Sequence, residues 1–261
     1  MDRRKIKTAL IFLLALLNLF LLGQWAVQRY TYYTSQRAAG ELLSAQLAEI
    51  GLTAQPGTWP TSVCMVYDSY RNPEKEAKAV SALLGEYETL DLGGGIVEYQ
   101  STLGAARLRG SGDVDIQLTL PRYFDDPEAD LRELAAAMGL IAGPETARLE
   151  PEADGYALLG TQSGFPVWEQ RLLFTLEEGR LTQIAGRWPM GADLRETAAQ
   201  SRSAGSALLA LAWSRQEAGA GPAVLLGMEL GYRMNVLSPS VIRLVPYWYI
   251  RLDDEDVYVA A

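Results

Sequence analysis

The sequence predicts an α+β protein in which an N-terminal transmembrane helix precedes two extracytoplasmic α+β units of similar build. Three observations predict this organisation: an uncharged apolar run near the N-terminus, alternating helix and strand patterns after it, and an echo between two Pro-x-Trp segments. We place the cytoplasmic N-terminus at 1–7, the transmembrane helix at 8–28, and a juxtamembrane segment and helix at 29–55. The first extracytoplasmic unit is expected at 56–122 and the second at 123–261.

The apolar run lies between Lys7 and Arg29 and contains no charged residue. A helix needs about 20 such residues to cross a hydrocarbon core. A secretory signal peptide has a shorter apolar segment that ends in a small-x-small cleavage site, which the residues from Gly23 to Val27 do not provide. Four basic residues precede the run and fewer follow it closely, so the N-terminus is expected in the cytoplasm. We therefore expect a single-pass protein of the cell membrane, held in the lipid bilayer, with its C-terminal domain outside.

Asn18 is a polar residue in the middle of this run. An amide inside a bilayer forms hydrogen bonds to other helices that are worth about 0.6–2 kcal/mol. With Ala15, Leu21 and Leu22, and next to Leu14, it forms a candidate contact face for a partner helix. The alternative is that the amide bonds its own backbone and is merely tolerated, and the sequence does not decide between the two.

Composition excludes several classes of function. The net charge is −9, and because residues 1–7 carry +3, the remainder carries about −12, which argues against a nucleic-acid partner. There is no histidine, which excludes Ser-His-Asp and Cys-His catalysis and histidine-containing zinc sites. The single cysteine, Cys64, cannot form an internal disulfide and is interpreted as a buried, inert thiol in an apolar strand.

The acidic and glycine-rich clusters have plain structural explanations. The acidic residues in 125–130 suit the start of a helix, and the run 253–256 suits a solvated hairpin turn. Calcium binding at 253–256 is the alternative, although the alternating spacing of a calcium loop is missing. Gly93–Gly95 lacks the Lys-Ser/Thr of a phosphate-binding loop. We assign no catalytic, cofactor-binding or metal-binding residue and expect a protein that is not an enzyme; a spatially assembled carboxylate pair of the glycosidase type stays open.

Three helices are predicted beyond the juxtamembrane helix. The first covers 72–87, with Asn72 as its N-cap and Pro73 at its first position; the others cover 125–140 and 193–216. Strand patterns fill most of the remaining chain, at 62–70, 95–102, 105–110, 113–120, 146–188 (with a hairpin turn at 177–179) and 222–261.

A similar sequence pattern recurs in two segments, "FPVWEQRLLFTLEEGRLTQIAGRW" and "VPYWYIRLDDEDVYVAA". Each begins Pro-x-Trp, runs as a strand, turns on acidic residues and returns, so Trp168 and Trp248 are predicted to occupy equivalent positions in two hairpins. Both tryptophans, and Trp59, are expected in the core rather than in a ligand groove.

Both ends of the chain resemble the YycI (WalI) family of regulatory membrane proteins of Gram-positive bacteria. The start, "MDRRKIKTALIFLLALLNLFLLGQ", resembles the family's Met-Asp, basic residues, Lys-Thr and apolar helix with Asn and Leu-Leu at its centre. The tail, "LGYRMNVLSPSVIRLVPYWYIRLDDEDVYVAA", resembles its Leu-Gly-Tyr, spacer, Pro-x-Trp and final hairpin ending on Tyr-Val. The segment "GTQSGFPVWEQRLLFTLEEGRLTQIAGRW" resembles its Gly-x-Pro strand pair.

The resemblance implies an accessory regulator of an envelope-sensing two-component system. Such a protein pairs with a YycH-like partner and modulates a WalK-type sensor histidine kinase through transmembrane helix contacts, here through Asn18 and its leucine face. It also implies an outer fold of mostly antiparallel sheet with packed helices. The alternatives are a bitopic envelope or divisome scaffold, a PepSY-like peptidase-binding domain, and, last, an envelope enzyme that uses carboxylates.

Overall fold

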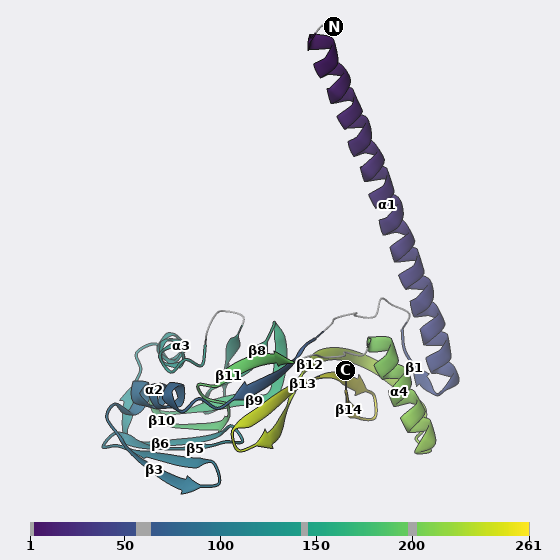
Figure 1. Ribbon diagram of the computed structural model, residues 1–261. Helices are drawn as coiled ribbons and strands as arrows, with labels where there is room; N and C mark the ends of the chain where they lie inside the picture. Colours follow the sequence, from purple (N-terminus) through teal and green to yellow (C-terminus); the bar gives the residue numbers. More distant parts are fainter. Residues whose placement is uncertain (1–2, 56–63, 142–145, 198–202, 261) are drawn as a thin grey trace. The chain divides into compact units, whose positions relative to one another are not determined.

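The computed structural model describes residues 3–55, 64–141, 146–197 and 203–260 (Figure 1). Its helices are α1 (Arg3–Glu49), α2 (Pro73–Leu84), α3 (Pro127–Ala137) and α4 (Ala204–Glu217). Its strands are β1 (Leu52–Thr53), β2 (Val66–Tyr70), β3 (Glu88–Gly93), β4 (Ile96–Gln100), β5 (Gly104–Arg109), β6 (Asp113–Tyr123), β7 (Ala147–Glu152), β8 (Gly155–Gln162), β9 (Phe165–Glu177), β10 (Arg180–Arg187), β11 (Asp193–Thr197), β12 (Ala223–Ser238), β13 (Val241–Leu252) and β14 (Asp256–Ala260).

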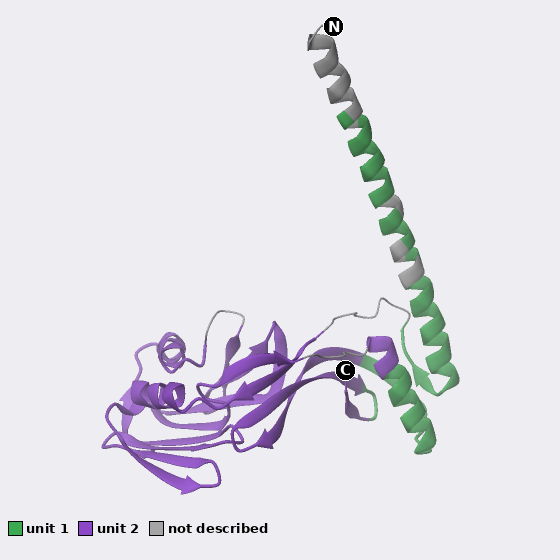
Figure 2. Ribbon diagram, in the orientation of Figure 1, with its two compact units in different colours: residues 1–60, 208–226, 252–254 green, residues 61–207, 227–251, 255–261 purple. Residues whose placement is uncertain are grey.

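The chain divides into two compact units (Figure 2). Unit 1 combines α1, β1, most of α4 and the start of β12; unit 2 holds α2, α3 and nearly all of the sheet. The ranges of unit 1 are 1–60, 208–226 and 252–254, and those of unit 2 are 61–207, 227–251 and 255–261.

The sheet is curled and mostly antiparallel, in the order β11-β2-β13-β12-β9-β10-β6-β5-β4-β3, with β7 and β8 added beside β9 and β14 beside β13. Among the described strands, β1 pairs with β12 in parallel, through Leu52 and Ala223, and so does β12 with β9, through Tyr232 and Val167. Most neighbouring strands are joined by short turns, which antiparallel pairing permits. The expected α+β class with a mostly antiparallel sheet and packed helices is confirmed.

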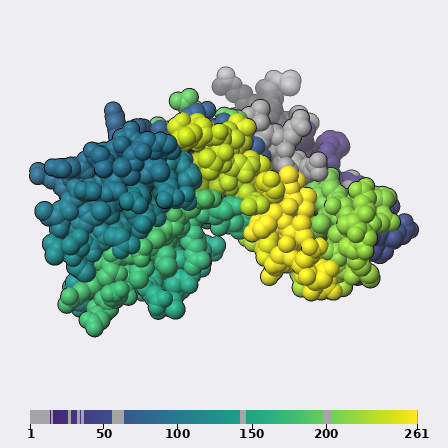
Figure 3. Space-filling model, turned by 90° about the horizontal axis from the view of Figure 1, so that it is seen from below, coloured from purple at the N-terminus to yellow at the C-terminus, as the bar shows by residue number. Residues whose placement is uncertain are grey.

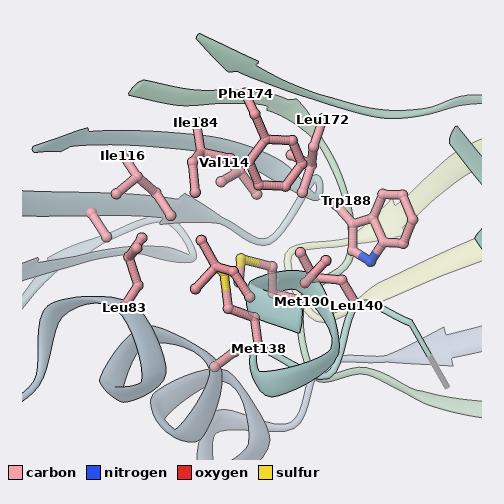
Figure 4. Close-up of a cluster of buried hydrophobic side chains, with 14 of the residues drawn as sticks. Leu83, Val114, Ile116, Met138, Leu140, Leu172, Phe174, Ile184, Trp188 and Met190 are labelled. Atoms are coloured by element: carbon pink, nitrogen blue, oxygen red, sulfur yellow. The ribbon is translucent and has the colours of Figure 1, made fainter. Parts of the chain in front are cut away.

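The main core of unit 2 lies between the sheet and the helices α2 and α3 (Figure 4). The helices contribute Leu83 and Leu131, and the sheet contributes Ile116 and Phe174, all of them nearly or fully excluded from solvent. Burying aliphatic and aromatic side chains of this size supplies most of the folding free energy of such a unit. Cys64 is buried as expected, and burial raises the pKa of its thiol, but the residue precedes β2 rather than lying in a strand.

Unit 1 has a small core of its own. Leu47 at the end of α1, Leu52 in β1 and Ala212 in α4 are almost fully buried. The backbone N–H of Ala223 donates to the carbonyl of Gly51 at 2.9 Å, which continues the pairing of β1 with β12. The last turns of α1 are therefore fixed by packing.

The helix capping signals are confirmed. The side chain of Asn72 accepts hydrogen bonds from the N–H groups of Glu74 and Lys75, and Pro73 stands at the first position of α2. Asp126 caps α3 in the same way, accepting from the N–H of Ala129 at 3.3 Å. These side chains satisfy N–H groups that the first turn of a helix leaves unpaired.

One local prediction was wrong, and one strand was not predicted. The segment 193–197, expected to open the third helix, is strand β11, because it pairs with β2 from Asp193 opposite Tyr70 to Thr197 opposite Val66. Strand β3, which the sequence left between a helix and the triglycine turn, pairs with β4. In both segments a non-local partner decides the conformation, and local patterns do not contain that information.

The predicted equivalence of the two tryptophans is also wrong. Both begin hairpins, β9–β10 and β13–β14, but Trp248 is 1% exposed in the core, whereas Trp168 is only half-buried and lies against Tyr258. The core prediction is therefore confirmed for Trp248 and not for Trp168. Trp59 lies outside the described residues.

Candidate functional site

The expected partner-contact face lies on α1, which is one continuous helix that includes both the apolar run and the predicted juxtamembrane helix. Asn18, Leu21 and Leu22 are exposed, the two leucines at 54% and 61%; the side chain of Ala15 lies outside the described part of the chain. The other exposed large apolar side chains of this stretch are Leu14, Leu16, Leu17, Leu19, Phe20 and Trp25. Within the part of the chain that the structure describes, no helix is both long enough and apolar enough to cross a membrane.

A cation–π contact lies at the end of this apolar surface. The guanidinium carbon of Arg29 is 4.9 Å from the centre of the Trp25 ring. An aromatic ring beside a basic residue is typical of the boundary between apolar and aqueous surroundings. The pair marks where the apolar surface of α1 ends and its polar surface begins.

The first two residues of the acidic turn, Asp253 and Asp254, are held within unit 1 by hydrogen bonds. The N–H of Val224 donates to Asp253 Oδ1 at 2.7 Å, and Arg215 Nη2 donates to Asp254 Oδ2 at 2.6 Å. Arg215 is only 8% exposed, and its ion pair with Asp254 helps to compensate its largely buried charge. Among the described residues, no three carboxylate, thiol or imidazole side chains are arranged to hold a metal ion.

An aromatic cluster covers part of the C-terminal strands, whose outer residues are coloured yellow in Figure 3. Trp168 and Tyr258 meet edge to face with ring centres 5.0 Å apart, and Tyr249 lies 5.0 Å from Tyr258. Arg233 lies over the Tyr258 ring at 4.9 Å and donates to Glu169 at 2.6 Å. The alternating "YWYI" pattern in β13 is the sequence signal for an outer aromatic face.

A pocket of about 310 Å³ opens in unit 2 beside Ser69. Its polar lining comes from strands β2, β8 and β9, from Lys75 in α2, and from Thr146 beside β7. Ser69 is 2% exposed, and its Oγ has no hydrogen-bond partner among the described residues. Sequence reasoning missed this pocket, because its walls are brought together only by the pairing of distant strands.

Comparisons with known proteins give no name for the fold. No protein-family model matches the chain, and no curated protein matches it. Among solved structures, the crystal structure of an uncharacterized protein from Eubacterium rectale ATCC 33656 is similar, with a TM-score of 0.44 and 10% sequence identity over 81% of this chain and 87% of that one.

Proposed function

We propose that this chain is a non-catalytic, membrane-anchored accessory regulator of a WalK-type sensor histidine kinase, acting with a YycH-like partner. The observation that carries the proposal is the exposed apolar surface of α1 with Asn18 in its middle. Leu16, Leu19 and Leu22 are 61–69% exposed, a state that is unfavourable in water and suits lipid or another helix. The ordered resemblance of the start, middle and tail of the sequence to the YycI family supports the choice of partners.

The chemistry of Asn18 supports a contact with another helix rather than a passive anchor. Its side chain is exposed on α1, so the amide can reach a neighbouring helix without displacing other side chains of this chain. In a bilayer such an interhelical hydrogen bond contributes about 0.6–2 kcal/mol, enough to bias an assembly that has two arrangements of similar free energy. The proposal includes the single membrane-spanning helix at 8–28, the cytoplasmic N-terminus, and two related α+β units outside.

The test is a pull-down from gently solubilised native membranes with three forms of the chain. The wild type is compared with Asn18→Leu and with the double variant Leu16→Asn/Asn18→Leu, which has the wild-type composition but moves the amide by about 200° around the helix. We expect the kinase and the YycH-like partner to co-purify with the wild type only. Equal recovery with all three forms would show that the amide is not a contact, and recovery of neither partner with the wild type would overturn the proposal.

A further inference from the structure

All the residues that line the pocket beside Ser69 belong to unit 2. In β2, Ser69 pairs with Leu194 of β11 and with Ile242 of β13, so these three side chains share one face of the sheet. The facing wall comes from β8 and β9, including Gln162 and Gln170. The volume of about 310 Å³ is within the range of small-molecule sites.

Two polar side chains in this pocket lack partners. The Oγ of Ser69 is buried and makes no hydrogen bond within the described structure. The amide of Gln170 likewise forms no hydrogen bond to another described side chain or backbone group, although it lies directly against β8: a Cβ at Gly160 would be 2.5 Å from Gln170 Cδ. Because leaving a buried hydroxyl unpaired costs about 1–3 kcal/mol, the Ser69 hydroxyl would gain from a hydrogen bond to a molecule in the pocket, and the half-buried amide of Gln170 can supply a second one.

The pocket has no net charge. Its one charged lining side chain, Lys75, donates to Asp193 Oδ1 at 2.6 Å, and this pairing compensates the ammonium. Apart from the indole N–H of Trp188, which can only donate, the remaining polar lining side chains are hydroxyls and amides, which both donate and accept hydrogen bonds. Leu140, shown in Figure 4, and Leu244 supply apolar contact area beside them. A positively or negatively charged ligand would therefore gain little electrostatic binding free energy in this pocket.

We propose that this pocket binds a neutral N-acetylated amino sugar unit of a glycan. Sugar hydroxyls both donate and accept, as do Ser69 and the glutamine amides, and the acetamido group offers one N–H and one carbonyl to the primary amide of Gln170. The acetyl methyl group and the C–H face of the ring match the leucine side chains. The site lies wholly in unit 2 and involves no residue of α1, so it stands independently of the regulatory proposal.

The test is titration calorimetry of the full chain, kept in a detergent without a sugar headgroup, with tri-N-acetylchitotriose as the probe. Cellotriose, which has the same ring linkage without acetamido groups, a charged hexuronic acid trimer and tri-alanine are the comparison ligands. We expect saturable binding of tri-N-acetylchitotriose in the millimolar range or tighter, and weaker binding of the three others.

Variants locate the binding. Ser69→Ala and Gln170→Ala each remove one hydrogen-bonding group and are expected to weaken binding about fivefold. Gln117→Ala is the matched control, because this exposed amide in β6 bonds only to Asp115 among the described residues and lies outside the pocket. If Ser69→Ala fails to fold, the binding affinity of Gln170→Ala alone tests whether the ligand occupies this pocket. Absence of saturable binding, equal binding by all variants, or a preference for tri-alanine or the charged trimer would each overturn the proposal.

Discussion

The guanidinium of Arg71 donates two hydrogen bonds to the carboxylate of Glu76, at 2.7 and 2.6 Å, and a third to the carbonyl of Gly95 at 2.7 Å. Glu76 is 3% exposed and also accepts from the hydroxyl of Tyr99 at 2.8 Å. Burial and this bond to Glu76 raise the pKa of the Tyr99 hydroxyl, which stays protonated. One buried carboxylate therefore joins the first turn of α2, the β3–β4 turn and the middle of β4.

Removing this carboxylate is expected to be costly. Glu76→Ala leaves the largely buried guanidinium of Arg71 without its partner, and breaking a buried pair in this way costs about 3–5 kcal/mol in the free energy of unfolding. Urea denaturation measures the loss. The exposed pair of Glu128 and Arg132 is the control, since Glu128→Ala should change stability by no more than about 1 kcal/mol. Equal effects of the two substitutions would contradict the central role of Glu76.

The pair of Asp68 and Arg243 predicts a dependence of stability on pH. Two hydrogen bonds from Arg243, at 2.7 and 2.9 Å, lower the pKa of Asp68 below its usual value of about 3.9. A lowered folded-state pKa stabilises the protein fully above the unfolded-state value, and this stabilisation is lost as the pH falls through the folded-state value.

This pH dependence is tested by measuring the free energy of unfolding of the wild type and of Asp68→Asn at acidic pH values. The difference in their free energies of unfolding should be constant above about pH 5 and shrink as the pH is lowered below about 4. A difference that grows on acidification would mean that the pair does not hold the carboxylate ionised.

The N-cap of α2 does more than cap the helix. Asn72 Oδ1 accepts from two backbone N–H groups, and its Nδ2 donates to Asp193 Oδ2 in β11 at 2.9 Å. Asn72→Ala is expected to lower the free energy of unfolding by about 1–2 kcal/mol. The comparison is Asp126→Ala at α3, where a single longer N-cap bond of 3.3 Å is lost and the cost should be smaller. Thermal unfolding followed by circular dichroism ranks the two, and the opposite order would count against the link to β11.

Gly231 is required by the position of Trp168. A Cβ at Gly231 would be 2.6 Å from Trp168 Cζ2 and 2.7 Å from the carbonyl oxygen of Pro166, so Gly231→Ala should cost about 1–3 kcal/mol and shift the tryptophan fluorescence. At Gly227, in the same strand, the nearest contact is the mobile end of Arg251 at 2.8 Å, which can move aside. Gly227→Ala should therefore be tolerated, and equal losses would argue against the packing of Trp168 on β12.

The sequence predicted the elements whose conformation is decided locally. The helix at Pro73–Leu84 follows from Asn72, Pro73 and apolar residues at helical spacing, and the hairpin after β9 follows from its acidic turn and Gly179. Asp193–Thr197 was assigned to a helix because its strand conformation depends on pairing with β2, more than 100 residues earlier in the chain.

The candidate sites also differ in whether one segment of sequence is enough to predict them. The α1 face was named in advance because a polar residue in an apolar run is visible in one segment of sequence. The pocket beside Ser69 was missed because its polar groups come from several strands and a helix, and no single segment of the sequence indicates their convergence. The unequal surroundings of Trp168 and Trp248 were missed because burial depends on which strands flank each hairpin.

The most direct test of the regulatory proposal is the autophosphorylation rate of a WalK-type kinase co-reconstituted in lipid vesicles with this chain and a YycH-like partner. We expect the wild-type chain to change the rate in a dose-dependent manner, and Asn18→Leu to leave the rate close to that of vesicles from which only this chain is omitted. A rate that is the same with the wild-type chain, with Asn18→Leu and without the chain would contradict the proposal that α1 regulates the kinase.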